Sequence, residues 1–221
     1  MIKTYRFTNF KRFDFNDVIK QTCDNKVVLI IANITILRDE NIIETYLSSE
    51  QIREKNNYYK QMDRNNYLLS HGIINRIFSS ILRVEGKDVV WNYTNYKKPY
   101  IKNKMGIKFN ISHTKGAIAI ALSINDVGVD IEYMEKNFNY KDIVNYSFNK
   151  NEKINTVIDF YKYWVAKEAY LKYKGIGLIQ DLRSIEIIEI TNNRGILKDK
   201  NKTKTFEIKE INDDYSVAIC F

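Results

Sequence analysis

Apolar segments and amphipathic segments follow one another along this 221-residue chain. Residues 27–36, VVLIIANITI, are apolar and β-branched, which predicts a buried strand. Residues 48–84 place apolar side chains at three-and-four spacing at several points, which predicts one or two helices ending before Gly86. Three further short strands are predicted at 107–112, 117–123 and 129–133, the last directly after Gly128.

The C-terminal part repeats this combination of helix and strands. Residues 139–174 are mostly helical in pattern, and Gly175 and Gly177 supply the expected C-terminal stop. Strand-like segments follow at 184–191, 203–210 and 215–221, and the lysine-rich LKDKNKTK before the second is interpreted as a solvated hairpin loop. About 26 residues precede the first predicted strand and match nothing.

These elements predict an α+β fold class with two similar-sized lobes that pack tightly. We place the N-terminal lobe at residues 1–125, with 1–26 as an unmatched extension, and the C-terminal lobe at 126–221. No apolar stretch reaches the roughly 18 residues that span a membrane. The first 26 residues carry six basic side chains without an apolar core. We therefore expect no membrane contact and a cytoplasmic location.

Charge and metal-ligand counts narrow the chemistry. Lysine plus arginine exceeds aspartate plus glutamate by eight, which suits nucleic acid, an anionic cofactor or an acidic protein as partner, although compositional bias alone also explains it. Two cysteines and two histidines exclude a zinc site of cysteines or a histidine-rich centre. A metal here would be held mainly by carboxylates, which favours Mg²⁺, with Mn²⁺ possible.

GVDIEY contains a candidate metal site. On a strand Asp130 and Glu132 project from one face, about 6.5–7 Å apart at the backbone, while Ile131 points into a core. Taken alone, the pair is more simply explained by an ordinary exposed face.

A second candidate is WVAKEAYLKYKGIGL, in which Trp164, Glu168, Lys172 and Gly175 share one helical face. A surface ion pair four residues apart would explain Glu168 and Lys172 alone, but not the tryptophan or the glycines.

FNISHTKG places Ser112 beside His113 near a strand end. Neighbouring strand residues face opposite ways, so this is a poor nucleophile–base pair, but both side chains could donate to a phosphate. A structural histidine is the alternative. Basic residues also occur in KKP and on the predicted helix, where a solvated face is the simpler interpretation: Lys97, Lys98, Arg53, Lys55, Lys60 and Arg64.

Taken in order, KKP, N-x-SH, G-x-D-I-E and W-x-x-K-E-A-x-x-K-x-x-G-x-G-L resemble the 4′-phosphopantetheinyl transferases. The likeness is to their longer class, which activates peptide synthetases such as surfactin synthetase. It covers Lys98 to Leu178 and continues weakly upstream to LSSEQIR and DRNNYLLSHGII. Ser112–His113–Thr114 departs slightly, because the family often has serine at the last position.

The resemblance implies transfer of phosphopantetheine from coenzyme A to a carrier-protein serine, by a pseudo-dimer of two α/β lobes with the cofactor between them. Asp130, Glu132 and Glu168 match the magnesium ligands. Glu168 is also the candidate base, directly or through a metal-bound water. Lys172 and His113 match groups that stabilise the leaving bisphosphate, and further matched positions would hold cofactor phosphates: Lys98, Ser112, His113, Lys167 and Lys172.

One motif departs from the family. Basic residues early in the helix after LS-x-x-E bind the cofactor's 3′-phosphate in the family, whereas Gln51 and Glu54 stand there in this chain. Arg53 and Lys55 are the nearest candidates, with Lys60 or Arg64 as alternatives.

The resemblance also implies a monomer whose partner is an acidic peptidyl or acyl carrier domain. Tyr133–Phe148 is a candidate docking surface or a helix that packs its own core. The rival functions are a magnesium-dependent phosphohydrolase or nucleotidyl transferase, and a basic nucleic-acid-binding module; we expect no nucleic-acid partner because no recognised binding motif occurs.

Overall fold

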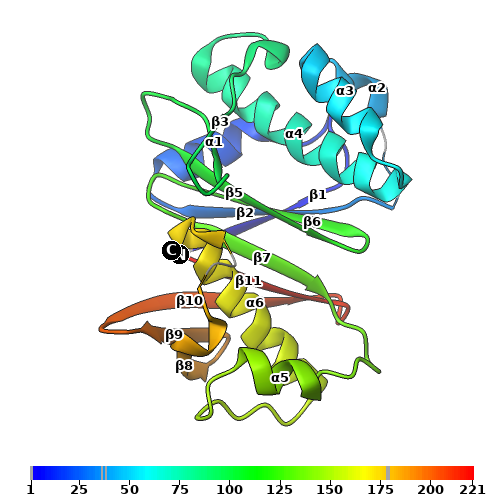
Figure 1. Ribbon diagram of the computed structural model, residues 1–221. Helices are drawn as coiled ribbons and strands as arrows, with labels where there is room; N and C mark the ends of the chain where they lie inside the picture. The colour runs from blue at the N-terminus through cyan, green and yellow to red at the C-terminus, as the bar shows by residue number, and fades with distance from the viewer. Residues whose placement is uncertain (1, 36, 38, 178–179) are drawn as a thin grey trace.

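The computed structural model describes residues 2–35, 37, 39–177 and 180–221, so Leu178 lies outside the described residues. Two β-sheets lie face to face in it, with helices on the outer side of each (Figure 1). The chain therefore has four layers, helix–sheet–sheet–helix. This mixed α+β architecture confirms the predicted fold class.

The first sheet has the strand order β1–β2–β6–β5. β1 and β2 are parallel and joined by α1, whereas the other pairs are antiparallel. Helices α1 to α4 cover its outer face (Figure 1). The bounds are β1 (Ile2–Phe7), α1 (Phe15–Cys23), β2 (Val27–Asn33), α2 (Glu40–Glu44), α3 (Ser49–Asn57), α4 (Gln61–Leu82), β5 (Lys108–Thr114) and β6 (Ala117–Ser123). Between α4 and β5 lie η1 (Gly86–Asp88) and a small pair, β3 (Asn92–Tyr93) and β4 (Pro99–Tyr100).

The second sheet is antiparallel throughout, in the order β7–β11–β10–β9–β8. Helix α6 crosses its outer face, and α5 lies at the end of α6 (Figure 1). The bounds are β7 (Gly128–Tyr133), α5 (Lys141–Ser147), α6 (Val157–Lys174), η3 (Leu182–Ser184), β8 (Ile185–Thr191), β9 (Arg194–Asp199), β10 (Lys202–Ile211) and β11 (Tyr215–Cys220).

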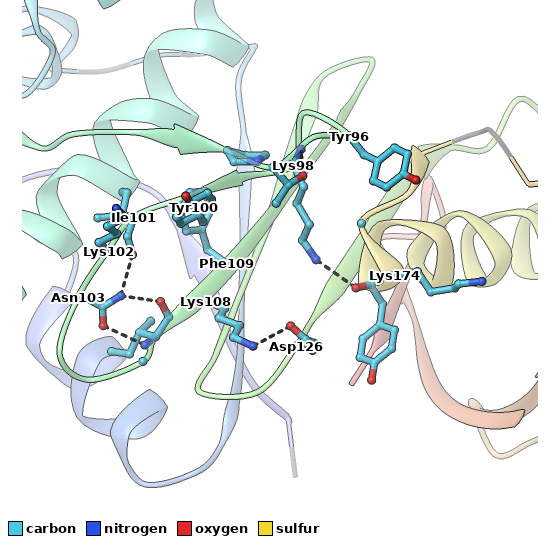
Figure 2. A pocket seen from close by; sticks show the side chains of 16 residues that line it. Tyr96, Lys98, Tyr100, Ile101, Lys102, Asn103, Lys108, Phe109, Asp126 and Lys174 are labelled. Carbon is cyan, nitrogen blue, oxygen red and sulfur yellow. Dashed lines mark hydrogen bonds and ion pairs between the residues drawn. The ribbon is translucent and has the colours of Figure 1, made fainter.

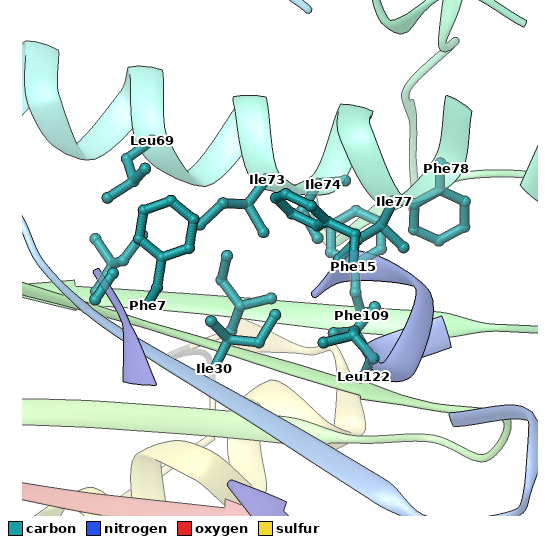
Figure 3. Close-up of a cluster of buried hydrophobic side chains, with 14 of the residues drawn as sticks. Phe7, Phe15, Ile30, Leu69, Ile73, Ile74, Ile77, Phe78, Phe109 and Leu122 are labelled. Atoms are coloured by element: carbon teal, nitrogen blue, oxygen red, sulfur yellow. The ribbon is translucent and has the colours of Figure 1, made fainter. Parts of the chain in front are cut away.

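The apolar run of β2 is buried on both faces because it lies between two cores. Its residues 28, 30 and 32 face the helices, where Ile30 meets Phe7 and the apolar side of α4 (Figure 3). Its residues 27, 29 and 31 face the second sheet and pack on Val129 and Ile131 of β7. Side chains alternate along a strand, so a run without polar residues fits a strand between two layers.

Helix α6 is defined at both ends by local sequence. Thr156 and Asp159 form a reciprocal capping box at its start, and Gly175, at φ +69°, ends it in the left-handed conformation. Its buried face, with Val165 and Ala169, packs on the second sheet. A Cβ on Gly128 would lie 2.1 Å from the Ala169 carbonyl oxygen, so only glycine lets β7 begin this close to the helix.

Two sequence predictions of elements need correction. The first strand does not begin near residue 27, because β1 and α1 come before it and belong to the first sheet and its covering layer. The hairpin predicted at 197–204 is present, but β9 and β10 run through the segment, and it turns only between Asp199 and Lys202. The stretch 139–174 is mostly helical, as predicted, and consists of α5 and α6 with a break between them.

The first sheet uses residues up to Ser123 and the second uses residues from Gly128 onward. The division into lobes at 125/126, and their similarity as a pseudo-dimer, stay predictions. Among the described helices, none combines the length and apolarity that crossing a bilayer requires.

Candidate functional site

Three acidic side chains lie near one another between β7 and α6. Asp130 and Glu132 lie on the face of β7 that is turned away from the sheet-to-sheet core, because Val129 and Ile131 occupy that core. Glu168 comes from α6, which packs along the same strand. Asp130 and Glu132 both act electrostatically on Glu168, so the strand pair and the helix acid form one site.

The acidic side chains of this site repel one another. Burial, and next the Asp130 carboxylate, raise the pKa of Glu168 to about 7, and the same two causes raise the pKa of Glu132 to about 7. Lys172 lowers both pKa values, but by less than burial and Asp130 raise them. The site therefore holds more negative charge than its single lysine offsets.

Lys172 and Ser112 hold one side of Asp130. The Lys172 ammonium donates to Asp130 Oδ1 (2.7 Å) and to the Ser112 hydroxyl oxygen (2.7 Å), and that hydroxyl donates to Asp130 Oδ1 (2.9 Å). The other carboxylate oxygen, Asp130 Oδ2, is buried without a hydrogen-bond partner, as is Glu168 Oε1. Buried acceptors without partners are costly and uncommon, so two in one acidic site indicate a missing positive group.

The residues fit a divalent cation, although they are not closed around one. Within residues 2–35, 37, 39–177 and 180–221, no three His, Cys, Asp or Glu side chains stand ready-made for a metal. The available donors are carboxylate oxygens, the ligands that Mg²⁺ and Mn²⁺ prefer. A cation among Asp130, Glu132 and Glu168 would partner the two orphaned oxygens and offset the repulsion.

The strand β5 positions the acids through its side chains. Asn110, Ser112 and Thr114 alternate along β5 and accept hydrogen bonds from three successive outward N–H groups of β7, at residues 129 (2.8 Å), 131 (3.4 Å) and 133 (3.1 Å). The opposite edge of β7 pairs with β11. This side-chain ladder joins the two sheets where a backbone ladder is absent.

The hydroxyls of the ladder also bind the acids. Ser112 donates to Asp130, and Thr114 Oγ1 donates to Glu132 Oε2 (3.1 Å). Each hydroxyl accepts from a β7 amide and donates to a β7 carboxylate, which uses both capacities of the group. Ser112 is also 95% buried, so the structure places it as a support of Asp130. Thr114 and Asn110 were missed as site residues, although the period-two pattern N-x-S-x-T could have revealed them.

Thr114→Val tests the ladder with an isosteric change. Removing the hydroxyl leaves the Tyr133 N–H and one Glu132 oxygen without this partner, so we expect the free energy of unfolding to fall by about 1–3 kcal/mol. Thr114→Ser retains the hydroxyl, so its free energy of unfolding should fall by less than about 1 kcal/mol. Urea denaturation of both variants measures the difference. Equal stability of the valine and serine variants would show that the ladder contributes nothing.

Lys98 lies at the C-terminal end of α6. Its ammonium donates to the carbonyl oxygens of Val127 (3.1 Å), Lys172 (2.6 Å) and Tyr173 (3.2 Å), as Figure 2 shows in part. A cation there donates to carbonyl oxygens at the helix end and complements the helix dipole. Burial lowers the pKa of Lys98 to about 8. Its charge is thus directed at the helix end that carries Lys172.

Lys167 is not brought to the acidic site. Its ammonium pairs with Glu152 (2.6 Å) and donates to the Leu182 carbonyl (3.1 Å), and the Lys167 side chain is 1% exposed. Glu152 in turn accepts from the backbone N–H groups of Asn149 (2.8 Å) and Ile187 (2.7 Å). The pair ties α6 to the segment before it and to β8. Glu152 is a residue that the sequence analysis did not single out.

His113 lies on the opposite side of β5 from the ladder, and desolvation with the Lys172 charge lowers its pKa. It lines a cavity of about 290 Å³. Arg53 is exposed on α3, and the buried Lys55 pairs with Glu44 of α2. Neither is among the described residues that line the cavity beside His113, whereas Glu54 is.

The fold and site define a two-sheet α+β protein with a carboxylate site suited to a divalent cation. Residues 126–220 match the 4′-phosphopantetheinyl transferase superfamily. This match agrees with the resemblance that the sequence motifs predicted.

Several proteins with similar sequences are named 4′-phosphopantetheinyl transferases. The 4′-phosphopantetheinyl transferase HetI of a Nostoc species is 29% identical over 153 residues, covering 64% of each chain. The transferase gsp of Aneurinibacillus migulanus is 27% identical over 77% of this chain and 69% of its own length. The transferase Sfp of Bacillus subtilis is 24% identical over 80% and 82%, respectively. The chain thus spans slightly less than two thirds of the Nostoc relative.

Proposed function

We propose that this protein is a magnesium-dependent 4′-phosphopantetheinyl transferase of the longer class. It moves the phosphopantetheine arm of coenzyme A to a serine of a carrier protein and releases adenosine 3′,5′-bisphosphate. The observation that carries this proposal is that Asp130 and Glu132 act electrostatically on Glu168, and that Asp130 Oδ2 and Glu168 Oε1 are buried without partners. That arrangement suits a cation and, with it, a diphosphate.

Each residue of the site has a role in this proposal. Asp130, Glu132 and Glu168 would hold Mg²⁺, which when bound offsets the diphosphate charge and polarises its phosphoryl oxygens. Lys172 supplies a positive charge next to Asp130. The lowered pKa of His113 favours its neutral form. A neutral imidazole can still donate one N–H to a phosphate oxygen.

The transfer forms one bond and breaks another. The serine oxygen of the carrier attacks the β-phosphorus, and the bond from that phosphorus to the oxygen bridging to the α-phosphate breaks. Glu168 takes the serine proton, and the bisphosphate leaves with the bridging oxygen and its electron pair.

A groove beside Glu132 gives the carrier a path to the site. Its volume is about 340 Å³, and Phe138, Ile143 and Trp164 line it. Phe138 and Ile143 also pack on Phe160, so the segment 133–148 both supports its own core and borders the groove. The net charge of +8 would favour an acidic carrier domain. The monomeric state, cytoplasmic location and lack of a nucleic-acid partner stay predictions.

The decisive experiment mixes the protein with Mg²⁺, coenzyme A and apo carrier domains, and weighs each carrier by mass spectrometry. We expect a gain of one phosphopantetheine group, lost when a chelator removes Mg²⁺ or when alanine replaces the carrier serine. No gain across peptidyl and acyl carriers would refute the proposal. Cleavage of coenzyme A without transfer would favour the phosphohydrolase instead.

A further inference from the structure

Strand β11 is hydrogen-bonded to the acid-bearing strand β7, and α6 packs against both strands (Figure 1). The antiparallel register pairs Ser216 with Glu132 and Ala218 with Asp130. Side chains of directly opposed residues lie on one side of a sheet. Ala218 packs in the core under α6, so Ser216 and Glu132 also lie on the side of the helix. Ser216 is therefore the cross-strand neighbour of a candidate metal ligand.

The hydroxyl of this serine has no partner. Ser216 is 0% exposed, and its Oγ is buried without a hydrogen bond. In the described part of the chain, five buried side-chain atoms lack a partner, and three of them lie between α6 and the second sheet: Asp130 Oδ2, Glu168 Oε1 and Ser216 Oγ. Buried polar atoms of this kind are costly and uncommon, so their gathering at one site calls for a cause.

Packing against α6 does not require a hydroxyl at position 216. Ala218 lies two residues further along the same face, is equally buried against the helix, and carries no polar side-chain atom. Alanine at position 216 would fill nearly the same space as serine without burying a polar group. Packing alone therefore does not explain Ser216.

The carboxylate of Glu132 is the acceptor that the register places beside Ser216. The Cβ atoms of directly opposed residues are about 4.5–5.5 Å apart, so rotation of the two side chains is enough to bring hydroxyl and carboxylate together. Thr114 Oγ1 already donates to Glu132 Oε2 from β5 (3.1 Å). A carboxylate accepts at about four positions on its two oxygens, so Glu132 can take a second hydroxyl from β11.

We propose, resting on the proposed function, that Ser216 is a positioning residue of the metal site. With a divalent cation bound among the acids, the Ser216 hydroxyl donates to the Glu132 carboxylate and fixes its orientation from β11, while Thr114 fixes it from β5. Carboxylates that ligate metals are themselves hydrogen-bonded, and loss of such a partner typically weakens metal binding by about 10–100-fold. Ser216 acts through Glu132 and does not touch the substrate.

Mg²⁺ binding to the metal-free protein, measured by titration calorimetry without coenzyme A, tests this role. Ser216→Ala should raise the Kd for Mg²⁺ by about tenfold, and a rise of less than about threefold would overturn the proposal. Without Mg²⁺, urea denaturation should find the variant as stable as the wild type or more so, because the change removes a buried hydroxyl without a partner. A loss of stability with an unchanged Kd would show a packing role instead.

Ser79→Ala is the matched control. Ser79 is a buried serine on α4, and its hydroxyl donates to the Arg76 carbonyl oxygen of the same helix (2.9 Å). This variant should leave the Kd for Mg²⁺ unchanged. A rise equal to that of Ser216→Ala would contradict the proposal, because it would show that loss of any buried hydroxyl weakens the site.

The transfer assay separates positioning of a metal ligand from a part in the chemistry. Saturating Mg²⁺ refills the site, so Ser216→Ala should need about tenfold more Mg²⁺ for half-maximal rate, with kcat within about threefold of the wild type. A kcat more than about tenfold lower at saturating Mg²⁺, with an unchanged Mg²⁺ requirement, would contradict the proposal. Absence of both Mg²⁺ binding and transfer in the wild type would refute the proposed function itself.

Discussion

Glu168→Gln should abolish phosphopantetheine transfer while the protein stays folded. The amide keeps the shape of the side chain but removes both a cation ligand and the group that takes the serine proton. Loss of a general base alone lowers a rate by about 10²–10⁴-fold, so we expect a fall of at least 10³-fold. Mass spectrometry of the carrier over time measures it. Asp130→Ala should cause a comparable loss.

Stability separates this functional role from a structural one. The pKa of Glu168 is about 7 in the folded protein, above the 4.5 of a free glutamate. Between those values the folded state binds more protons than the unfolded state, so stability falls as pH rises through this window. Glutamine has no proton to lose. At pH 8 without Mg²⁺, the variant should therefore melt at the same temperature as the wild type or higher.

Added Mg²⁺ should make the wild type melt at a higher temperature than Glu168→Gln. A cation that binds only the folded protein raises its melting temperature, so the wild type should gain stability with added Mg²⁺ and Glu168→Gln should gain less. Glu189→Gln, an exposed glutamate on β8, is the control and should behave as the wild type in both measurements. Transfer by Glu168→Gln within tenfold of the wild type would show that Glu168 is neither base nor essential ligand.

The sequence was informative where spacing alone decides geometry. Two acids two residues apart on β7 must share a face, and Glu168 and Lys172 must share a face of α6. The apolar run in β2 likewise predicted a buried strand. These are local consequences of strand and helix periods, and the structure retains them.

Hydrogen bonds and ion pairs between residues far apart in the sequence could not be predicted. Nothing local indicates that Lys98 binds carbonyl oxygens at the end of α6, or that Lys167 turns to Glu152. Strand β1 was missed because its sequence, IKTYRF, mixes charged and apolar residues at a sheet edge. The lysines of 197–204 indicated a loop, but lysine is also common on the exposed faces of strands. Composition alone therefore could not separate a loop from β9 and β10.

Lys167→Met should cost the protein about 3–5 kcal/mol of unfolding free energy, because it leaves the Glu152 carboxylate buried without its cation. The Lys167 and Glu152 side chains are 1% and 0% exposed, so water cannot replace the lost partner. Urea denaturation measures the loss. Lys162→Met is the matched control, since Lys162 is on the same helix and pairs with Glu210 near the surface; it should cost less than about 1 kcal/mol.

A double variant, Lys167→Met with Glu152→Gln, should recover part of the loss, since glutamine is uncharged and still accepts from the Ile187 and Asn149 amides. The kinetics then separate two roles for Lys167. If it holds a cofactor phosphate, Lys167→Met raises the KM for coenzyme A and the double variant does not restore it. If it positions α6 through Glu152, the double variant recovers stability and transfer together. The buried pair favours the second result, and a KM defect that persists at restored stability would contradict it.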